Sequence, residues 1–269
     1  MAAVADLLRV ATGAPDLVRR LSDADAGLRR AVPTSRRIAF LQADGGAGAT
    51  VTASRLGSAL AGRRAGEVLA VDAARGRGAL AAAAGVDAPP ALGHVALSAA
   101  GITRAAQARK LAPRSRTGLI VVGDGGPVPA TTDEWHAALD QVGRFFDVVL
   151  TDWGVRREDA LRDIAAASHV VAVVSRADRG PAERGAALAA TVAAEGVAPV
   201  VLVLVDVGGG ASATAAMLER ATDLPVLTVP HAPGLRDGQR LTARLGLRSR
   251  AAYATVASEL LRVTVGVAA

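Results

Sequence analysis

The stretch Asp44-Gly45-Gly46-Ala47-Gly48-Ala49-Thr50 joins an apolar run, Ile38 to Leu41, to a stretch of helical character, Val51 to Gly62. A strand, a glycine-rich turn and a helix in that order place backbone N–H groups at the start of the helix, where they can bind phosphate oxygens. The sequence therefore predicts a phosphate-binding turn whose contacts come from Gly45, Gly46, Ala47, Gly48, Ala49, Thr50 and Val51.

This turn has the order of a P-loop but lacks its lysine, because Ala49 stands between the last glycine and Thr50. A hydrogen bond to a charged group contributes roughly 1.5–3 kcal/mol, so losing one or two weakens nucleotide binding by about one to four decades. Backbone amides, the helix dipole and the Thr50 hydroxyl remain. We expect ATP and magnesium to bind weakly or not at all. The alternative is that the glycines only connect strand and helix closely.

Beyond this turn, apolar runs alternate with helical stretches. Runs such as Val200 to Val205 are continuous, which indicates strands buried on both faces of a parallel sheet. The pattern predicts an α/β fold with a doubly wound, mostly parallel sheet flanked by helices. Strands are expected at 38–42, 68–72, 118–122, 147–152, 169–175, 199–206 and 225–229, and helices at 51–63, 131–145, 157–167, 179–195, 211–222 and 248–263. The poorer pattern of residues 73–117 predicts short helices and loops.

The two ends of the chain carry helical patterns outside this alternation. Residues 1–35 are predicted to form a helical appendage and linker, and residues 36–269 the main domain. The appendage either packs on the domain through its leucine stripe or docks a partner or anionic surface. At the other end, residues 248–269 have a modest apolar stripe and few basic residues, which favours packing on the domain. A membrane is therefore not an expected partner.

Composition narrows the class of protein. The net charge is +6, and Lys110 is the only lysine among 31 basic residues. A nucleic-acid footprint needs clustered charge, and an aromatic content of 2% gives few stacking platforms, so DNA is not expected either. The chain has no cysteine, and its four histidines lack paired zinc-binding spacing, so no structural metal is expected. Without a span-length apolar run or a signal-peptide pattern, a cytoplasmic location is expected.

Acidic residues stand where several expected strands end. Ligands of open parallel sheets bind beyond the carboxyl ends of the strands. Asp72, Asp152 and Asp206 are the last residues of three of these strands, and the glycine turn follows a fourth. This convergence indicates one site at that edge of the sheet.

At these points the chain resembles the ParA/MinD family of P-loop ATPases, whose loop reads K-G-G-x-G-K-[ST]-[ST]. The segment Asp44 to Val51 keeps the three glycines and the first hydroxyl residue, but Asp44 and Ala49 replace the two lysines. In the family, the first lysine reaches a partner subunit's nucleotide and the second holds the β- and γ-phosphates. The resemblance covers about residues 36–262 and implies a homodimer.

The resemblance also implies roles for other residues. Thr50 matches the hydroxyl that binds magnesium, and Asp152 ends a strand like the family's magnesium-linked Walker B strand. Asp72 matches the first aspartate of a V-D-x-D segment and completes the implied metal set, but Ala74 replaces the second, water-orienting aspartate. The loop from Val229 to Gly238 resembles the one that covers adenine, which implies base contacts from Asp206, Pro230 and His231.

Two subgroups share further motifs with this chain. Leu150-Thr151-Asp152-Trp153-Gly154 and the proline-containing loop after Val229 resemble the actinobacterial MinD-like proteins of type VII (ESX) secretion systems. Gly45 to Ala49 also resembles some TadZ/CpaE-like proteins of pilus assembly.

The replacements predict a pseudo-ATPase without catalytic residues, with hydrolysis absent or very weak. Its implied role is a docking or positioning module for a protein partner in a secretion, pilus or partition machine. Two alternatives stay open. One is a slow ATP-dependent dimerisation switch in secretion, pilus assembly or chromosome partitioning, and the other is a partition-type protein that binds DNA non-specifically.

Overall fold

The computed structural model describes residues 16–64, 67–74, 76, 79–123, 125–208, 211–230 and 245–266. These residues form a seven-stranded sheet in the order β3-β2-β4-β1-β5-β6-β7, with every neighbouring pair parallel. The strands are β1 (Arg36–Leu41), β2 (Val68–Asp72), β3 (Ile120–Val122), β4 (Val148–Gly154), β5 (Val170–Arg176), β6 (Val200–Val205) and β7 (Val226–Val229). The predicted parallel α/β fold and all seven expected strands are thus confirmed.

Helices connect the strands as expected. They are α2 (Ala49–Ala61), α3 (Ala79–Ala84), α4 (Leu92–Ala99), α5 (Ala105–Ala108), α6 (Thr132–Leu139), α7 (Leu161–Ala166), α8 (Arg179–Ala194), α9 (Ala211–Ala221) and α10 (Leu247–Gly266), with 3₁₀ turns at Gly143–Phe145 and Glu158–Ala160. The main difference is α6, which was expected to reach residue 145. The predicted span includes Gly143, a poor helix former, and the chain there makes a 3₁₀ turn instead.

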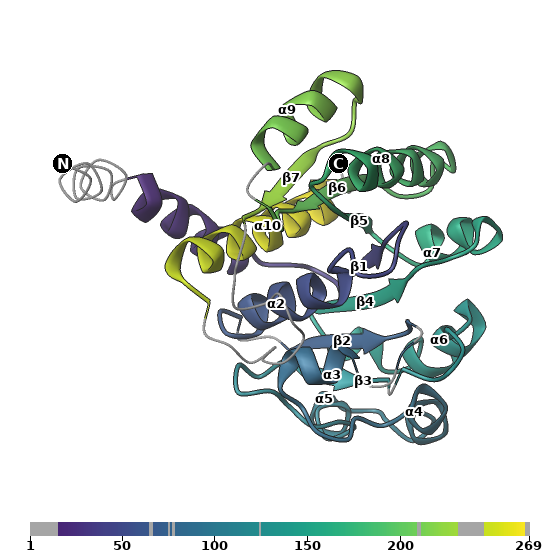
Figure 1. Ribbon diagram of the computed structural model, residues 1–269. Helices are drawn as coiled ribbons and strands as arrows, with labels where there is room; N and C mark the ends of the chain where they lie inside the picture. The colour runs from purple at the N-terminus through teal and green to yellow at the C-terminus, as the bar shows by residue number, and fades with distance from the viewer. Residues whose placement is uncertain are drawn as a thin grey trace.

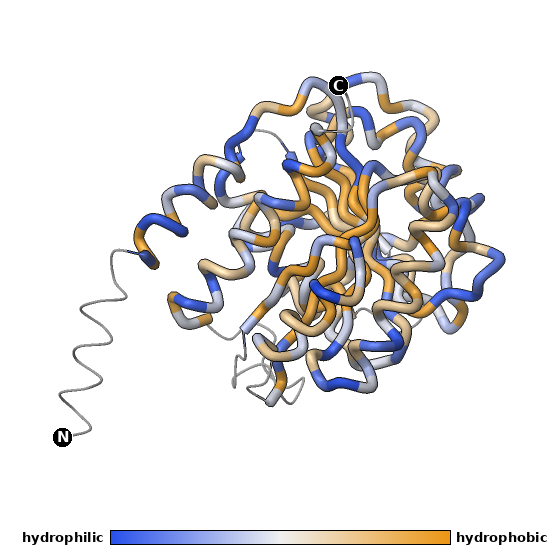
Figure 2. Tube along the Cα trace, turned by 90° about the horizontal axis from the view of Figure 1, so that it is seen from above, coloured by the Kyte–Doolittle hydropathy of each residue, from blue (hydrophilic) through white to orange (hydrophobic). Residues whose placement is uncertain are grey.

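The sheet is the middle layer of three. Figure 1 shows the strands stacked from β3 to β7, with α2 and α10 on one side and α6, α7 and α8 on the other. Side chains of α2, α3 and α10 share one apolar cluster with one face of the sheet, and those of α4 and α6 to α9 share a second cluster with the other face. Hydrophobic segments accordingly fill the centre of the molecule in Figure 2, with hydrophilic segments around them.

Both terminal segments pack in the layer that contains α2 and α10. The described part of the N-terminal segment is helical from residue 16 to residue 28, and Leu28 is buried in the cluster that contains α10. Gly27 fits against α10 so closely that a Cβ there would lie 1.8 Å from the Ser258 hydroxyl oxygen. Helix α10 packs on α2 and β7, which confirms the expected packing of the C-terminal helix. Among the described helices, none combines the length and apolarity needed to cross a bilayer.

Candidate functional site

The glycine turn lies between the end of β1 at Leu41 and the start of α2 at Ala49. Gly46 and Gly48 have φ angles of +79° and +92°, in the region that glycine adopts without steric strain. A Cβ added at Gly45 or Gly46 would meet no atom within 4 Å, so the turn borders open space. No described residue accepts a hydrogen bond from the N–H groups of Gly45, Gly46 or Gly48. These amides are therefore available to an anion.

Thr50 and Asp152 meet beside this turn. The Thr50 hydroxyl donates to Oδ2 of Asp152 at 2.5 Å, and the Gly154 N–H donates to Oδ1 at 3.1 Å. Asp152 is 0% exposed. Burial raises the pKa of this carboxyl group, and the two hydrogen bonds and the charge of Arg156 oppose the rise. A hydroxyl and a carboxylate side by side are oxygen ligands of the kind that Mg²⁺ prefers.

Asp72 is the third residue of the predicted metal set. It lies opposite Asp152 in the register of β2 and β4. Its Oδ2 accepts a hydrogen bond at 3.2 Å from the buried N–H of Leu80 in the first turn of α3. The structure therefore brings Thr50 and Asp152 into contact, while one oxygen of Asp72 is directed to α3.

The two lysine positions of the loop have different surroundings. Ala49 is 0% exposed and belongs to the apolar cluster that includes Phe40, and its N–H donates to Oε1 of Gln42 at 3.4 Å. Asp44 forms an ion pair with Arg184 of α8, with Nη2 and Oδ2 2.9 Å apart. One position is thus part of the core, and the other is acidic and neutralised within the same chain.

The predicted base-contacting residues follow β6 and β7. A Cβ on Gly48 would lie 3.7 Å from Val205, the last residue of β6, so the glycine turn lies against this strand end. Asp206 comes next, and its Oδ1 accepts from the Gly208 N–H at 3.0 Å. Pro230 is half-buried directly after β7. His231 lies outside the described residues.

The sequence pattern does not single out Gln42 and Arg184, which contact the glycine turn, or Arg156, which contacts the chain at the ends of β2 and β4. Arg156 donates to the carbonyl oxygens of Trp153 and Ala130 at 2.8 Å each and of Ala73 at 2.5 Å. Burial lowers the pKa of Arg156 to about 10, although the charge of Asp152 acts against this shift. Arg156 therefore ties the ends of β2 and β4 together. A contact such as Asp44–Arg184, 140 residues apart in sequence, leaves no local pattern.

Solved structures give the fold a class. The ParA family ATPase of Chlorobium tepidum superposes with a TM-score of 0.66 at 18% sequence identity. The match covers 82% of this chain and 98% of that ATPase. MinD of Pyrococcus horikoshii, solved with Mg-ADP, superposes with a TM-score of 0.58 at 16% identity over 84% of this chain and 95% of its own. MinD of Aquifex aeolicus in its complex with MinC gives 0.58 at 16% identity, over 87% and 95%.

No family model and no curated protein sequence matches this chain. At such low identities the structural likeness establishes the fold alone. The chain has the P-loop NTPase fold of the ParA/MinD type. The glycine turn joins β1 to α2 in this fold.

The polar groups of this site are of the types that bind a magnesium nucleotide. The turn offers N–H groups without acceptors among the described residues, and Thr50 and Asp152 offer a hydroxyl and a carboxylate. No group of three or more His, Cys, Asp or Glu side chains forms a metal cage within the described ranges. Mg²⁺ fits two protein ligands, because it usually keeps several waters and binds substrate phosphates.

Proposed function

We propose that this protein is a pseudo-ATPase that binds a magnesium nucleotide weakly and serves as a docking or positioning module for a secretion or partition machine. The carrying observation is that the P-loop has its backbone shape and its Thr50–Asp152 pair, whereas neither lysine position holds a cation. Shape and cation make separate contributions to phosphate binding, so the loss of one weakens binding without abolishing it.

The nucleotide would be held mainly by the chain's backbone. The N–H groups of Gly45 to Val51 would bind phosphate oxygens, that of Ala49 after leaving Gln42. Thr50 and Asp152 would hold magnesium, which neutralises phosphate charge. Asp72 would support this site through its bond to α3. Asp206, Pro230 and His231 would line the base. The free amides of the turn support this assignment.

Hydrolysis has less support from the residues present. Phosphoryl transfer depends on positioned cations that neutralise the charge of the transition state. Ala49 is buried in the apolar core, and Asp44 is acidic and paired with Arg184, so neither lysine position supplies a cation. Ala74 offers no group to orient water. We therefore propose that turnover is absent or very slow.

A pseudo-ATPase of this kind acts through contacts with other proteins. We propose a protein partner from a secretion, pilus or partition machine, and a homodimer as the working form. Among the solved structures of this fold, MinD of Aquifex aeolicus is in complex with the protein MinC. That complex supports partner docking as a use of the fold.

Calorimetric titration with Mg-ATP, with turnover measured on the same sample, tests the proposal. We expect a dissociation constant in the micromolar to millimolar range, weakened further in Thr50→Ala, and phosphate release at the background rate. Turnover above background that Thr50→Ala or Asp152→Ala abolishes would overturn the pseudo-ATPase and favour the slow ATP-dependent dimerisation switch. Absence of any Mg-ATP binding would reduce the loop to a connection between β1 and α2.

A further inference from the structure

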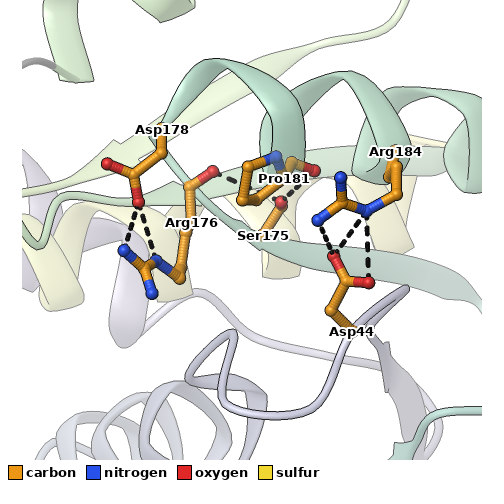
Figure 3. A network of polar contacts seen from close by, with 6 residues as sticks. All are labelled: Asp44, Ser175, Arg176, Asp178, Pro181 and Arg184. Atoms are coloured by element: carbon orange, nitrogen blue, oxygen red, sulfur yellow. Dashed lines mark hydrogen bonds and ion pairs between the residues drawn. The ribbon is translucent and has the colours of Figure 1, made fainter.

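Contacts between the start of α8 and the end of β5 position Arg184 beside the glycine turn. Figure 3 shows its side chain reaching from α8 to Asp44, with Nε 2.9 Å from Oδ2. Under the helix, the Ser175 hydroxyl at the end of β5 donates to the carbonyl of Pro181 at 2.7 Å. A Cβ on Gly185 would lie 2.6 Å from the Ser175 Cβ, so α8 lies closely on the strand. The backbone that carries Arg184 is therefore held in a defined position.

The guanidinium group itself is held weakly. The Arg184 and Asp44 side chains are 57% and 41% exposed. An ion pair this exposed contributes a factor of about five or less to an equilibrium, because water solvates both partners. A charge-assisted hydrogen bond to phosphate contributes a factor of about ten to a hundred. A bound polyphosphate would therefore compete successfully with Asp44 for this cation.

In the described part of the chain, the other arginines near the start of α8, and Arg156 after β4, have other partners. Arg176 pairs with Asp178, Arg179 pairs with Glu183, and Arg156 donates to three carbonyl oxygens. Among the described residues, Arg184 is the arginine that contacts the glycine turn. Its fork of N–H groups also suits two phosphate oxygens at once.

We propose that Arg184 replaces the missing P-loop lysine: it leaves Asp44 and binds the phosphates when a nucleotide enters. The proposal rests on the nucleotide binding proposed above. Asp44 then acts as a competitor that holds the cation while the site is empty, and its carboxylate is solvated once released. Nucleotide binding would thereby open the contact between the P-loop and α8.

The competing explanation is that Arg184 only neutralises Asp44. A double-mutant cycle separates the two, because that role disappears when Asp44 is absent. We would measure Mg-ATP dissociation constants by calorimetry for the full chain and for Asp44→Ala, Arg184→Ala and the double variant. Asp44→Ala should tighten binding several-fold, which also brings the weak affinities into a measurable range. In the Asp44→Ala background, Arg184→Ala should weaken binding about ten- to a hundredfold.

Two controls sharpen this cycle. Arg176→Ala removes a positive charge from the same end of α8 but breaks only the pair with Asp178, so the affinity should change less than threefold. Arg184→Lys in the Asp44→Ala background should recover part of the lost affinity, because the charge returns without the fork. All substituted side chains are exposed, and circular dichroism would verify folding.

The outcomes separate a failure of the Arg184 proposal from a failure of the proposed nucleotide binding. If Arg184→Ala changes affinity less than threefold in the Asp44→Ala background while Mg-ATP still binds, Arg184 is only the counter-charge of Asp44, and nucleotide binding stands. If neither the natural chain nor Asp44→Ala binds Mg-ATP, the proposed function and this inference fail together.

Discussion

Asp152 and Asp72 lie at matching positions near the ends of neighbouring strands, yet they accept hydrogen bonds from different helices. Both are almost fully buried, and the register of β2 and β4 places them side by side. Asp152 accepts from Thr50 in the first turn of α2, whereas Asp72 accepts from Leu80 in the first turn of α3. The first turn of α2 directly follows the glycine turn, and that of α3 does not.

The two aspartates differ in the helix whose first turn donates a hydrogen bond to them. A buried carboxylate needs hydrogen-bond donors, and the nearest backbone or hydroxyl donor meets that need. The resemblance implies one metal set for both aspartates together with Thr50, and this stays a prediction. The hydrogen-bond donors to the two aspartates differ, and we propose that Asp152 faces the nucleotide while Asp72 supports the start of α3.

Arg156 joins the two strand ends, and its removal should have the largest effect. Arg156→Ala leaves the carbonyl oxygens of Trp153, Ala130 and Ala73 without this donor, and we expect a loss of about 2–4 kcal/mol in the free energy of unfolding. Urea denaturation measures it. The matched control is Arg157→Ala, whose side chain is 91% exposed and should change stability by about 0.5 kcal/mol or less. Equal effects of the two variants would mean that the strand ends hold without Arg156.

Asp72→Ala probes the structural side of the comparison. The buried Leu80 N–H loses its acceptor, so we expect a decrease of about 1–3 kcal/mol in the free energy of unfolding. Asp72→Asn keeps a carbonyl oxygen at that place and should lose less. Equal losses for the two variants, measured by urea denaturation, would contradict the assigned contact with α3.

Thr50→Val probes the other side, with the smallest expected effect on stability. The variant keeps the shape of the side chain but removes the donor to Asp152, while the Gly154 N–H remains. Since Thr50 is half-buried, water can replace part of the lost bond, and we expect a decrease of about 0.5–1.5 kcal/mol. Thr50→Ser keeps the hydroxyl and serves as the control. A Val variant as stable as the natural chain would contradict a stabilising Thr50–Asp152 hydrogen bond.

Much of the fold followed from local pattern. Continuous apolar runs such as Val200 to Val205 predicted a parallel sheet, because strands buried on both faces show no alternation. The order of strand, glycine turn and helix predicted a helix from residue 51, and α2 begins two residues earlier, at Ala49. Thr50 and Asp152 were placed together correctly, since parallel strands and their following helices meet at one edge.

The remaining features depend on contacts that no short stretch encodes. Arg184 reaches Asp44 across 140 residues, and neither residue stands in a motif that names the other. Asp72 accepts a hydrogen bond from α3 because this helix, residues 79–84, begins beside it. Arg156 resembles any exposed arginine in sequence until the ends of β2 and β4 surround it. Such side chains are placed by packing between distant elements.

We propose that Asp152 helps to hold magnesium at the glycine turn and that Asp72 stabilises the start of α3. Mg-ATP affinity tests this most directly. Calorimetric titrations of the natural chain, Asp152→Asn and Asp72→Asn would be run with magnesium and again in EDTA. We predict that Asp152→Asn loses about tenfold or more of the magnesium-dependent affinity, because a charged ligand becomes neutral, and that Asp72→Asn stays within about threefold of the natural chain. A tenfold loss in Asp72→Asn, with Asp152→Asn unchanged, would contradict the account.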